Sequence, residues 1–329
     1  MFLRALCLLV SLSLTGVGAD LKVGMIGLDT SHAVEFTQRL NDPTDKNFIP
    51  GARIVVAFKG GSPDIPSSWN RVEGFTKTLR EKYSVKIVDS VDAVLTEADV
   101  VMIENVDGRP HLKEALATIN AHKPVFIDKP LAGSLRDALE IYRQARVKGV
   151  PIFSASSLRY YPSLQRMKSA EIGEIRGAIS CGPCELESHH PDLFWYGIHS
   201  TEALYTIMGD GCESVVCTAT ANTHVVTGIW KDGRVGTVCG LREAPYEFRM
   251  TVFGSKKVLD EKLDGDYTPF LREVVKFFQS RVAPVPPEET LEIYAFMEAA
   301  DESKRNGGCT VKIADVIRKS GGRDEEIPK

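Results

Sequence analysis

The chain has 329 residues and a mass of 36.2 kDa, which is enough for two domains of ordinary size. Hydrophobic residues make up 43% of it and charged residues 26%, so the composition excludes a disordered chain, a collagen and a disulfide-stapled miniprotein. The 40 basic and 44 acidic residues give a net charge of −4, without a long basic run. This balance argues against a nucleic-acid partner and favours a small-molecule ligand.

Residues 1–19 have the pattern of a cleaved secretory signal peptide. A short positive start ends at Arg4, an apolar run covers residues 5–14, and Val17-Gly18-Ala19 offers small residues for cleavage before Asp20. The apolar run is too short to span a membrane. We therefore expect export to the periplasm or the extracellular space, with no membrane association after cleavage. The alternative is an uncleaved N-terminal anchor.

The cysteines do not form a stapling framework, because only six of the seven lie beyond residue 19 in a long chain. Cys181-Gly182-Pro183-Cys184 has the spacing of a thioredoxin-type redox pair, but it follows a predicted strand at 176–180 instead of opening a helix. We expect a turn at Gly-Pro, and a disulfide between Cys181 and Cys184 stays an open possibility.

In the first half, short runs rich in Val and Ile alternate with segments of helical periodicity. The predicted strands are residues 21–26, 53–58, 100–103 and 125–127, and the predicted helices are 69–83, 110–121 and 135–146. Such alternation predicts a parallel sheet with helices on both faces, which is an α/β, Rossmann-like domain. We assign residues 20–131 to it.

The second half has a different pattern, in which predicted strands follow one another directly. These strands are residues 175–181, 215–220, 225–230, 234–241 and 247–253, and the predicted helices are 199–208, 269–280 and 288–305. Lys231-Asp232-Gly233-Arg234 is a hairpin signal between two of the strands. Residues 132–329 are therefore expected to form an α+β domain with a largely antiparallel sheet.

The first strand leads into a turn that occupies the place of a dinucleotide-binding fingerprint. Gly27 stands where the backbone turns, but Asp29 and His32 stand where two further glycines are usual. We expect this turn, with Leu28 and Thr30, to contact the cofactor. The Asp29 carboxylate either faces the pyrophosphate, and weakens its binding, or turns away to cap the following helix.

The second strand lacks the acidic residue that usually binds the ribose of NAD. Lys59 follows it instead, and this lysine and Ser62 could bind the 2′-phosphate of NADP. The alternative is a glycine turn with a solvated lysine.

Asp128-Lys129-Pro130 ends the predicted strand 125–127. Ligands of open parallel sheets bind at the carboxyl ends of the strands, so Lys129 is expected at the site. An ammonium group there can stabilise a developing alkoxide. Asp128 is expected to lie next to the cofactor.

At these residues the sequence resembles the Gfo/Idh/MocA superfamily, which includes relatives of glucose–fructose oxidoreductase and inositol dehydrogenase. The resemblance covers nearly all of residues 21–315 and rests on the Gly27 turn, Asp128-Lys129-Pro130 in place of Glu-Lys-Pro, Glu174-Ile175-Arg176, Gly197-Ile198-His199 and the closing helix 298–305. It implies a Rossmann domain, a second domain with an open-faced sheet that often mediates oligomers, and NAD(P)-linked oxidation of sugars or polyols. Lys129 and His199 match the family's lysine and its acid/base histidine.

The chain departs from the family pattern at two places. The glycine fingerprint is altered, and Trp195 stands where an aspartate commonly lies four residues before the histidine. His199 itself opens a predicted helix, whose positive end favours the neutral imidazole that a general base needs. The alternative is a half-buried structural histidine.

Residues 187–196, which precede His199, are rich in polar and aromatic side chains, as sugar sites are. We expect substrate contacts from His190, Asp192, Trp195 and Tyr196. A metal site formed by His190, Asp192 and His199 is a weaker alternative, as is an ordinary loop, and we expect no metal.

The sequence therefore predicts an exported NAD- or NADP-dependent oxidoreductase that acts on a hydroxyl group of a sugar, sugar acid or cyclitol, and that forms a homo-oligomer. One alternative is a sugar hydrolase or lyase in which a retained NAD oxidises the substrate transiently. The other is a sugar-binding protein without catalytic activity.

Overall fold

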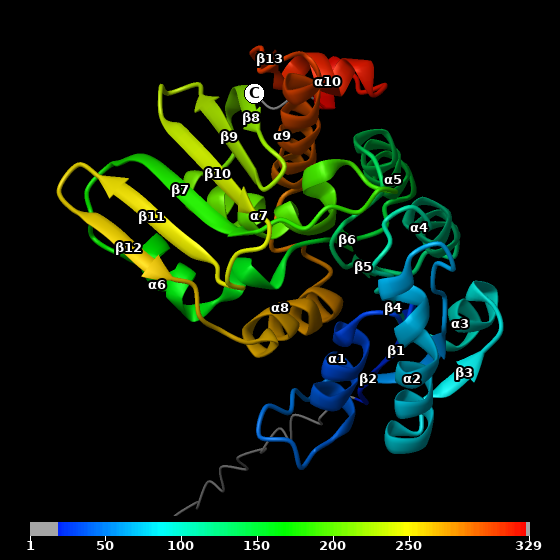
Figure 1. Cartoon of the computed structure of the whole chain (residues 1–329). Helices are drawn as coiled ribbons and strands as arrows, with labels where there is room; N and C mark the ends of the chain where they lie inside the picture. The colour runs from blue at the N-terminus through cyan, green and yellow to red at the C-terminus, as the bar shows by residue number, and fades with distance from the viewer. Residues whose placement is uncertain (1–18, 327–329) are drawn as a thin grey trace, which may run out of the picture.

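The computed structural model describes residues 19–326, so the predicted signal peptide lies outside the described residues apart from Ala19. Two sheets dominate the structure, and the helices between and around them join the two halves into one body (Figure 1). None of the helices in the described part of the chain is long and apolar enough to cross a membrane.

The first sheet has six parallel strands in the order β3-β2-β1-β4-β5-β6, which is the order of dinucleotide-binding folds. The strands are β1 (Leu21–Ile26), β2 (Ala52–Phe58), β3 (Lys86–Val88), β4 (Val100–Ile103), β5 (Val125–Ile127) and β6 (Ile152–Phe153). The connecting helices are α1 (Ser31–Asn41), α2 (Pro66–Tyr83), α3 (Val91–Glu97), α4 (His111–Asn120) and α5 (Leu135–Lys148). The predicted α/β domain is confirmed.

The first domain extends beyond the expected boundary at residue 131. Helix α5 and strand β6 complete the six-stranded sheet, because β6 pairs with β5 in parallel. Helix α8 (Tyr267–Ser280), from much later in the chain, also packs on this sheet through Phe270 and Phe277, which share an apolar core with β1 and α1. The sequence pattern cannot place such a long-range contact.

The second sheet has seven strands in the order β12-β11-β7-β10-β9-β8-β13. These are β7 (Ile175–Pro183), β8 (Cys212–Ala219), β9 (Thr223–Trp230), β10 (Val235–Leu241), β11 (Arg249–Gly254), β12 (Val258–Lys262) and β13 (Val311–Lys312). Only β7 and β10 pair in parallel within this sheet of the described chain, so the largely antiparallel arrangement is confirmed.

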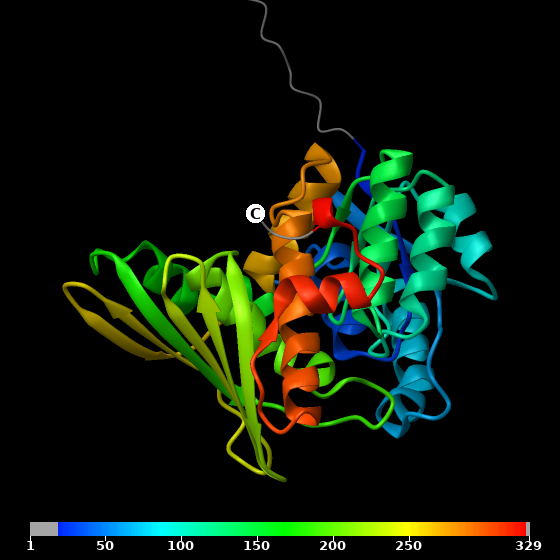
Figure 2. The ribbon, with the colours of Figure 1, turned by 90° about the horizontal axis from the view of Figure 1, so that it is seen from above.

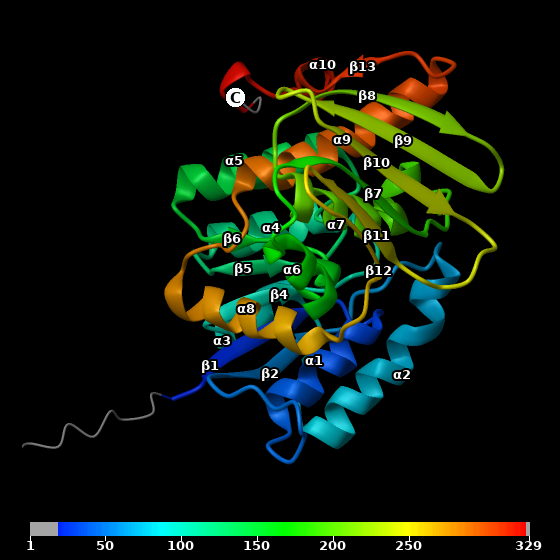
Figure 3. The ribbon, with the colours of Figure 1, turned by 90° about the vertical axis from the view of Figure 1, so that its left-hand side faces the viewer.

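Helices cover one side of the second sheet. Helices α7 (Ile198–Met208) and α9 (Pro287–Arg305) lie between this sheet and the first domain (Figure 2). The other helices of the second half are α6 (Pro162–Ser169) and α10 (Ile313–Lys319). The opposite face of the sheet is open, as Figure 3 shows.

The expected turn within Cys181–Cys184 does not form. Strand β7 continues through Gly182 to Pro183, and the Cys184 amide donates to the Leu241 carbonyl. Because Pro183 is the last residue of the strand, its missing N–H does not interrupt the pairing. All six cysteines of the described chain are free thiols.

Candidate active site

A cavity of about 350 Å³ lies between the two domains, at the carboxyl ends of the parallel strands. The first domain contributes the start of α1 and Lys129. The second domain contributes Trp195 and Tyr196, which precede α7, and His199 at the start of that helix. The lining side chains include Thr30, Ser31, His32, Arg71, Lys129, Trp195, Tyr196, His199 and Tyr246. The structure therefore brings together Lys129 and His199, the two residues expected to be catalytic.

Lys129 is held at the cavity by the end of β5, and its side chain is largely buried. The preceding residue, Asp128, is 1% exposed, and its Oδ2 lies 2.7 Å from His32 Nδ1. This contact ties the start of α1 to the end of β5, so His32 serves here as a polar partner of Asp128 at a position where a glycine is usual.

His199 is buried and its ring is fixed by a 2.7 Å hydrogen bond between Nδ1 and Ser156 Oγ. Burial is the main cause that holds the pKa of His199 well below its ordinary value, and the nearby charge of Lys129 acts in the same direction. The imidazole is therefore neutral at physiological pH. A neutral imidazole in a cavity can accept a proton from a hydroxyl group.

The segment before α7 forms one turn of π-helix, Leu193–Gly197, which turns two aromatic side chains toward the cavity. Tyr196 packs edge-on against His199, and its hydroxyl lies 2.7 Å from the hydroxyl of Tyr246. Trp195 lines the same cavity and packs against His190. Single π-helical turns are frequent at functional sites.

His190 and Asp192, which we expected to contact substrate, do not line this cavity. His190 is enclosed between the domains, where its Nε2 lies 3.1 Å from both Asp107 Oδ1 and the Gly108 amide. Asp192 pairs with His224 and Lys304, and the hydrogen bond from His224 is the main cause that lowers its pKa to about 2. Their partners come from distant segments, which the local sequence pattern does not show.

Asp29 neither caps α1 nor points into the cavity. The N-cap is Thr30, whose side chain accepts from the His32 amide. The buried Asp29 carboxylate accepts a hydrogen bond from the Val106 amide at 3.0 Å and another from the Ser68 hydroxyl at 2.6 Å. Asp29 therefore links the turn after β1 to α2 and to the loop after β4.

The loop after β2 folds over the turn at Gly27, which has a φ of +91°. A Cβ on Gly60 would fall 2.4 Å from Asn105 Oδ1 and 3.1 Å from the Gly27 Cα, so the loop lies close to this turn and has no room for a side chain at residue 60. Leu28 is buried in the core. Lys59 lies outside the cavity and pairs with Glu73 at 2.7 Å, instead of facing a nucleotide site.

Part of this site fits a nicotinamide dinucleotide. Thr30 and Ser31 bring the N-terminus of α1 to the cavity, and Arg71 from α2 adds a cation suited to phosphate. From there the cavity reaches Lys129 and His199, where the nicotinamide would lie. On the adenosine side, the loop at Gly60 lies close to Gly27 and Asn105.

Three residues of this region were not expected from the sequence: Arg71, Ser156 and Glu104. Arg71 and Ser156 reach the site through the tertiary fold, and no local motif marks them. Glu104 directly follows β4, as Asp128 directly follows β5, and both side chains are buried. The rule that sites form at the carboxyl ends of parallel strands was therefore enough to find Glu104.

Structural comparisons give the same architecture. The myo-inositol dehydrogenase of Lactobacillus casei, solved with NAD(H) and myo-inositol, is 18% identical, with a TM-score of 0.70 over 89% of this chain and 96% of that chain. The scyllo-inositol dehydrogenase of the same organism is 14% identical, with a TM-score of 0.71 over 90% and 98%. GenD2 from gentamicin A biosynthesis, solved with NAD, is 16% identical, with a TM-score of 0.72 over 89% and 96%. At such low identity, these TM-scores show a shared fold alone.

The sequence comparisons identify the first domain. No curated protein matches the chain. Residues 21–156 match the GFO_IDH_MocA profile, which is described as an oxidoreductase family with an NAD-binding Rossmann fold. The matched range ends after β6, where the first sheet ends. Residues 21–156 are therefore similar to the NAD-binding Rossmann domain of the Gfo/Idh/MocA oxidoreductase family.

Proposed function

We propose that this protein is an exported NAD(P)-dependent oxidoreductase that acts on a hydroxyl group of a sugar, sugar acid or cyclitol. The observation that carries the proposal is the meeting of Lys129 and a neutral His199 in one cavity, next to the N-terminus of α1. The two side chains come from different domains, so the cavity is complete only when both are packed together.

The side chains divide the chemistry between them. His199 takes the proton of the substrate hydroxyl, and its hydrogen bond to Ser156 holds the ring in place. The Lys129 ammonium stabilises the negative charge that develops on the same oxygen. The nicotinamide, when bound, supplies the hydride acceptor.

The side chains that line the cavity are suited to a polyol substrate. Trp195, Tyr196 and Tyr246 offer aromatic faces and hydroxyl groups, which suit the CH faces and hydroxyls of a sugar ring. The inositol dehydrogenases among the structural neighbours act on cyclitols, which is consistent with this substrate class.

The test begins with the mature chain, residues 20–329, purified without added cofactor. Mass spectrometry of the ligand released on denaturation should find NAD or NADP, or calorimetric titration should show that one of them binds. A panel of sugars, sugar acids and cyclitols should then contain a compound whose oxidation reduces the cofactor. Substrate turnover without net reduction of the cofactor would instead indicate redox-assisted cleavage, and sugar binding without any dinucleotide would indicate a binding protein.

Export is part of the proposal and has its own test. The full-length chain, expressed in a bacterial host, should be recovered outside the cytoplasm with Asp20 as its N-terminal residue. Recovery with the first 19 residues intact would contradict it.

A further inference from the structure

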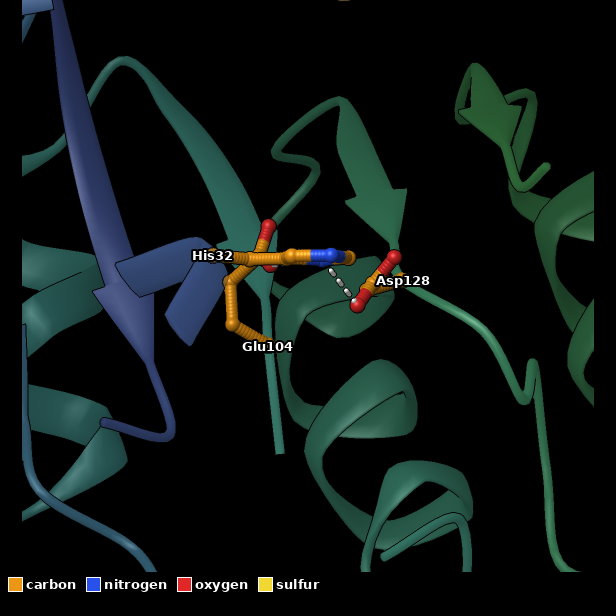
Figure 4. A group of neighbouring side chains, drawn as sticks. All are labelled: His32, Glu104 and Asp128. Carbon is orange, nitrogen blue, oxygen red and sulfur yellow. Dashed lines mark hydrogen bonds and ion pairs between the residues drawn. The ribbon is translucent and has the colours of Figure 1, made fainter. Parts of the chain in front are cut away.

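Two buried carboxylates next to the cavity take no part in the proposed proton transfer. Glu104 follows β4 and Asp128 follows β5, and their side chains are 0% and 1% exposed. His32, at the start of α1, completes the group. One potential ligand atom from each of the three residues lies within 4.8 Å of the others, and Figure 4 shows the side chains meeting from three separate segments.

Three of the four carboxylate oxygens in this group have no hydrogen-bond partner among the described residues. Neither carboxylate oxygen of Glu104 has a hydrogen-bond partner, and Oδ1 of Asp128 has none either. The Lys129 charge acts on both groups from a distance, but within the described residues it forms no ion pair with either. An unpaired buried carboxylate is costly in free energy unless it takes up a proton or binds a cation, and a metal ion would supply that cation.

We propose that His32, Glu104 and Asp128 bind a divalent first-row transition-metal ion at the wall of the cavity. With bonds of about 2.1 Å, two ligand atoms lie about 3.0 Å apart at a right angle and about 3.4 Å apart in a tetrahedron. His32 Nδ1 lies 2.7 Å from Asp128 Oδ2 and 4.0 Å from Glu104 Oε2. Small side-chain movements therefore bring all three atoms to bonding distance of one ion.

The donor set selects the class of ion. One imidazole nitrogen and two carboxylates suit Zn²⁺, Fe²⁺ or Mn²⁺, whereas Mg²⁺ and Ca²⁺ prefer oxygen ligands alone. Three protein ligands leave at least one coordination position open, as in catalytic zinc sites. This set differs from the His190, Asp192 and His199 group, which the structure does not bring together.

The location of the site would allow the ion to contact a ligand in the cavity. His32 lines the cavity beside Lys129, so the open position is within reach of a ligand bound there. An ion at this place would bind a hydroxyl or carboxylate oxygen of the ligand and polarise it, in addition to Lys129. A hydroxy acid or a vicinal diol, which offers two oxygens, is the ligand class that this arrangement favours.

The experiment uses the mature chain without a histidine tag, after EDTA has removed bound metal. Neither dinucleotide nor sugar is added, so the outcome is independent of the proposed oxidoreductase activity. Zn²⁺ binding is measured by elemental analysis after dialysis and by competition with a chelating dye. We expect the wild type to bind about one equivalent of Zn²⁺. The Kd of Glu104→Gln should be at least about 100-fold higher, because loss of a hydrogen bond to a metal ligand already weakens metal binding by about 10- to 100-fold and loss of the ligand itself costs more. Mg²⁺ should not compete.

Glu114→Gln is the matched control, because Glu114 is also a buried carboxylate but accepts a hydrogen bond from Asn105 at 2.7 Å. It should bind Zn²⁺ as the wild type does. If Glu104→Gln fails to fold, the wild type still decides the question: Co²⁺ should give a saturable visible absorption band at one equivalent, and Zn²⁺ should raise its Tm. A wild type that retains no Zn²⁺ and shows no Co²⁺ band would overturn the proposal, as would undiminished binding in folded Glu104→Gln.

Discussion

Burial sets the protonation state of His199, and this has a measurable consequence. A pKa well below the ordinary value keeps the imidazole unprotonated as the pH falls through the range near 6.5, where an exposed histidine becomes charged. We expect kcat/KM for hydroxyl oxidation to stay level through that range and to fall only at lower pH. An acidic limb at about 6.5 would show that the base is another group.

The same histidine can be titrated by NMR without any substrate. Lys129 contributes to the lowered pKa of His199, so Lys129→Met should raise that pKa. Lys86→Met, which removes an exposed lysine paired with Glu97, is the control and should leave it unchanged. Equal titration in all three proteins would mean that Lys129 lies too far from the ring to influence it.

Lys129 itself is expected to be essential for turnover. Loss of a charge that stabilises the developing oxyanion costs roughly 3 kcal/mol or more, which lowers kcat by at least about 100-fold. Lys129→Met should show this loss with an unchanged unfolding midpoint. Lys262→Met removes a lysine that lines the same cavity but already pairs with Glu247 at 2.9 Å, and its effect should be much smaller. Similar losses in both variants would point to the overall charge of the cavity.

Asp29 is important for stability in this structure. Asp29→Ala leaves the Val106 amide and the Ser68 hydroxyl without their acceptor, and each unsatisfied buried group costs about 1–3 kcal/mol. We expect the free energy of unfolding in urea to fall by about 3 kcal/mol. Asp29→Asn keeps one acceptor oxygen and should lose less than half of that. A change below about 0.5 kcal/mol in Asp29→Ala would show that these contacts are absent in solution.

At the level of elements, the loop after β2, residues 59–65, is expected to control the access of a dinucleotide to its site. Ser62 donates to Asp107, and Arg109 bridges Asp107 and the exposed Asp64, so the loop is fastened to the segment after β4. These contacts keep the backbone of Gly60 over Gly27. We therefore expect the loop to open when the adenosine half of a dinucleotide binds, and this cost would lower the apparent affinity.

Removal of one contact that holds this loop closed should therefore increase the affinity for the cofactor. Asp64→Asn removes the exposed ion pair with Arg109, which is worth about 0.2–1 kcal/mol, so we expect NAD to bind up to about five-fold more tightly by calorimetry. Glu97→Gln is the control: it removes an exposed ion pair with Lys86, which does not involve this loop, and it should not change the affinity for NAD. Unchanged or weaker binding in Asp64→Asn would show that the loop does not limit access.

The elements differ in how well the sequence predicts them. Strands β4 and β5 are continuous runs of apolar residues, and the predicted Val100–Ile103 and Val125–Ile127 match them. Strands β3 and β6 are three and two residues long, too short to show a period, and they form because neighbouring strands offer hydrogen bonds. Gly182-Pro183 was predicted to be a turn because the pairing of β10 with these two residues is not visible in the local sequence.

At the level of the whole molecule, the order of strands and the class of each domain follow from the sequence, but the boundary between the domains does not. One apolar core runs from β4 and β5, through α5, into the side of the second sheet that α7 and α9 cover. The site depends on this continuity, because His199 and Lys129 belong to different domains. Contacts of this kind join residues far apart in the chain, and the periodicity of either segment carries no information about them.

The open face of the second sheet offers the last prediction. Five large apolar side chains lie on it between 37% and 47% exposed: Ile179, Val225, Ile229, Val235 and Phe253. Three of them lie in one row, because Val235 pairs with Ile229 on one side and, across Gly177, aligns with Phe253 on the other. Exposed apolar side chains on a sheet face that no helix of residues 19–326 covers are typical of a protein interface, and a homodimer through two such faces would cover both copies.

We therefore expect the mature chain to be a dimer or a larger homo-oligomer at micromolar concentration, as measured by light scattering after size exclusion. Ile229→Lys combined with Phe253→Lys places two charges in the centre of that interface, where their burial is costly, and should yield a monomer. Both positions are solvent-exposed in a single copy, so the free energy of unfolding of the monomer itself should change little. Val147→Lys alters a side chain that is 71% exposed on α5, away from the sheet, and should leave the oligomer intact. A monomeric wild type would show that this face has another partner or none.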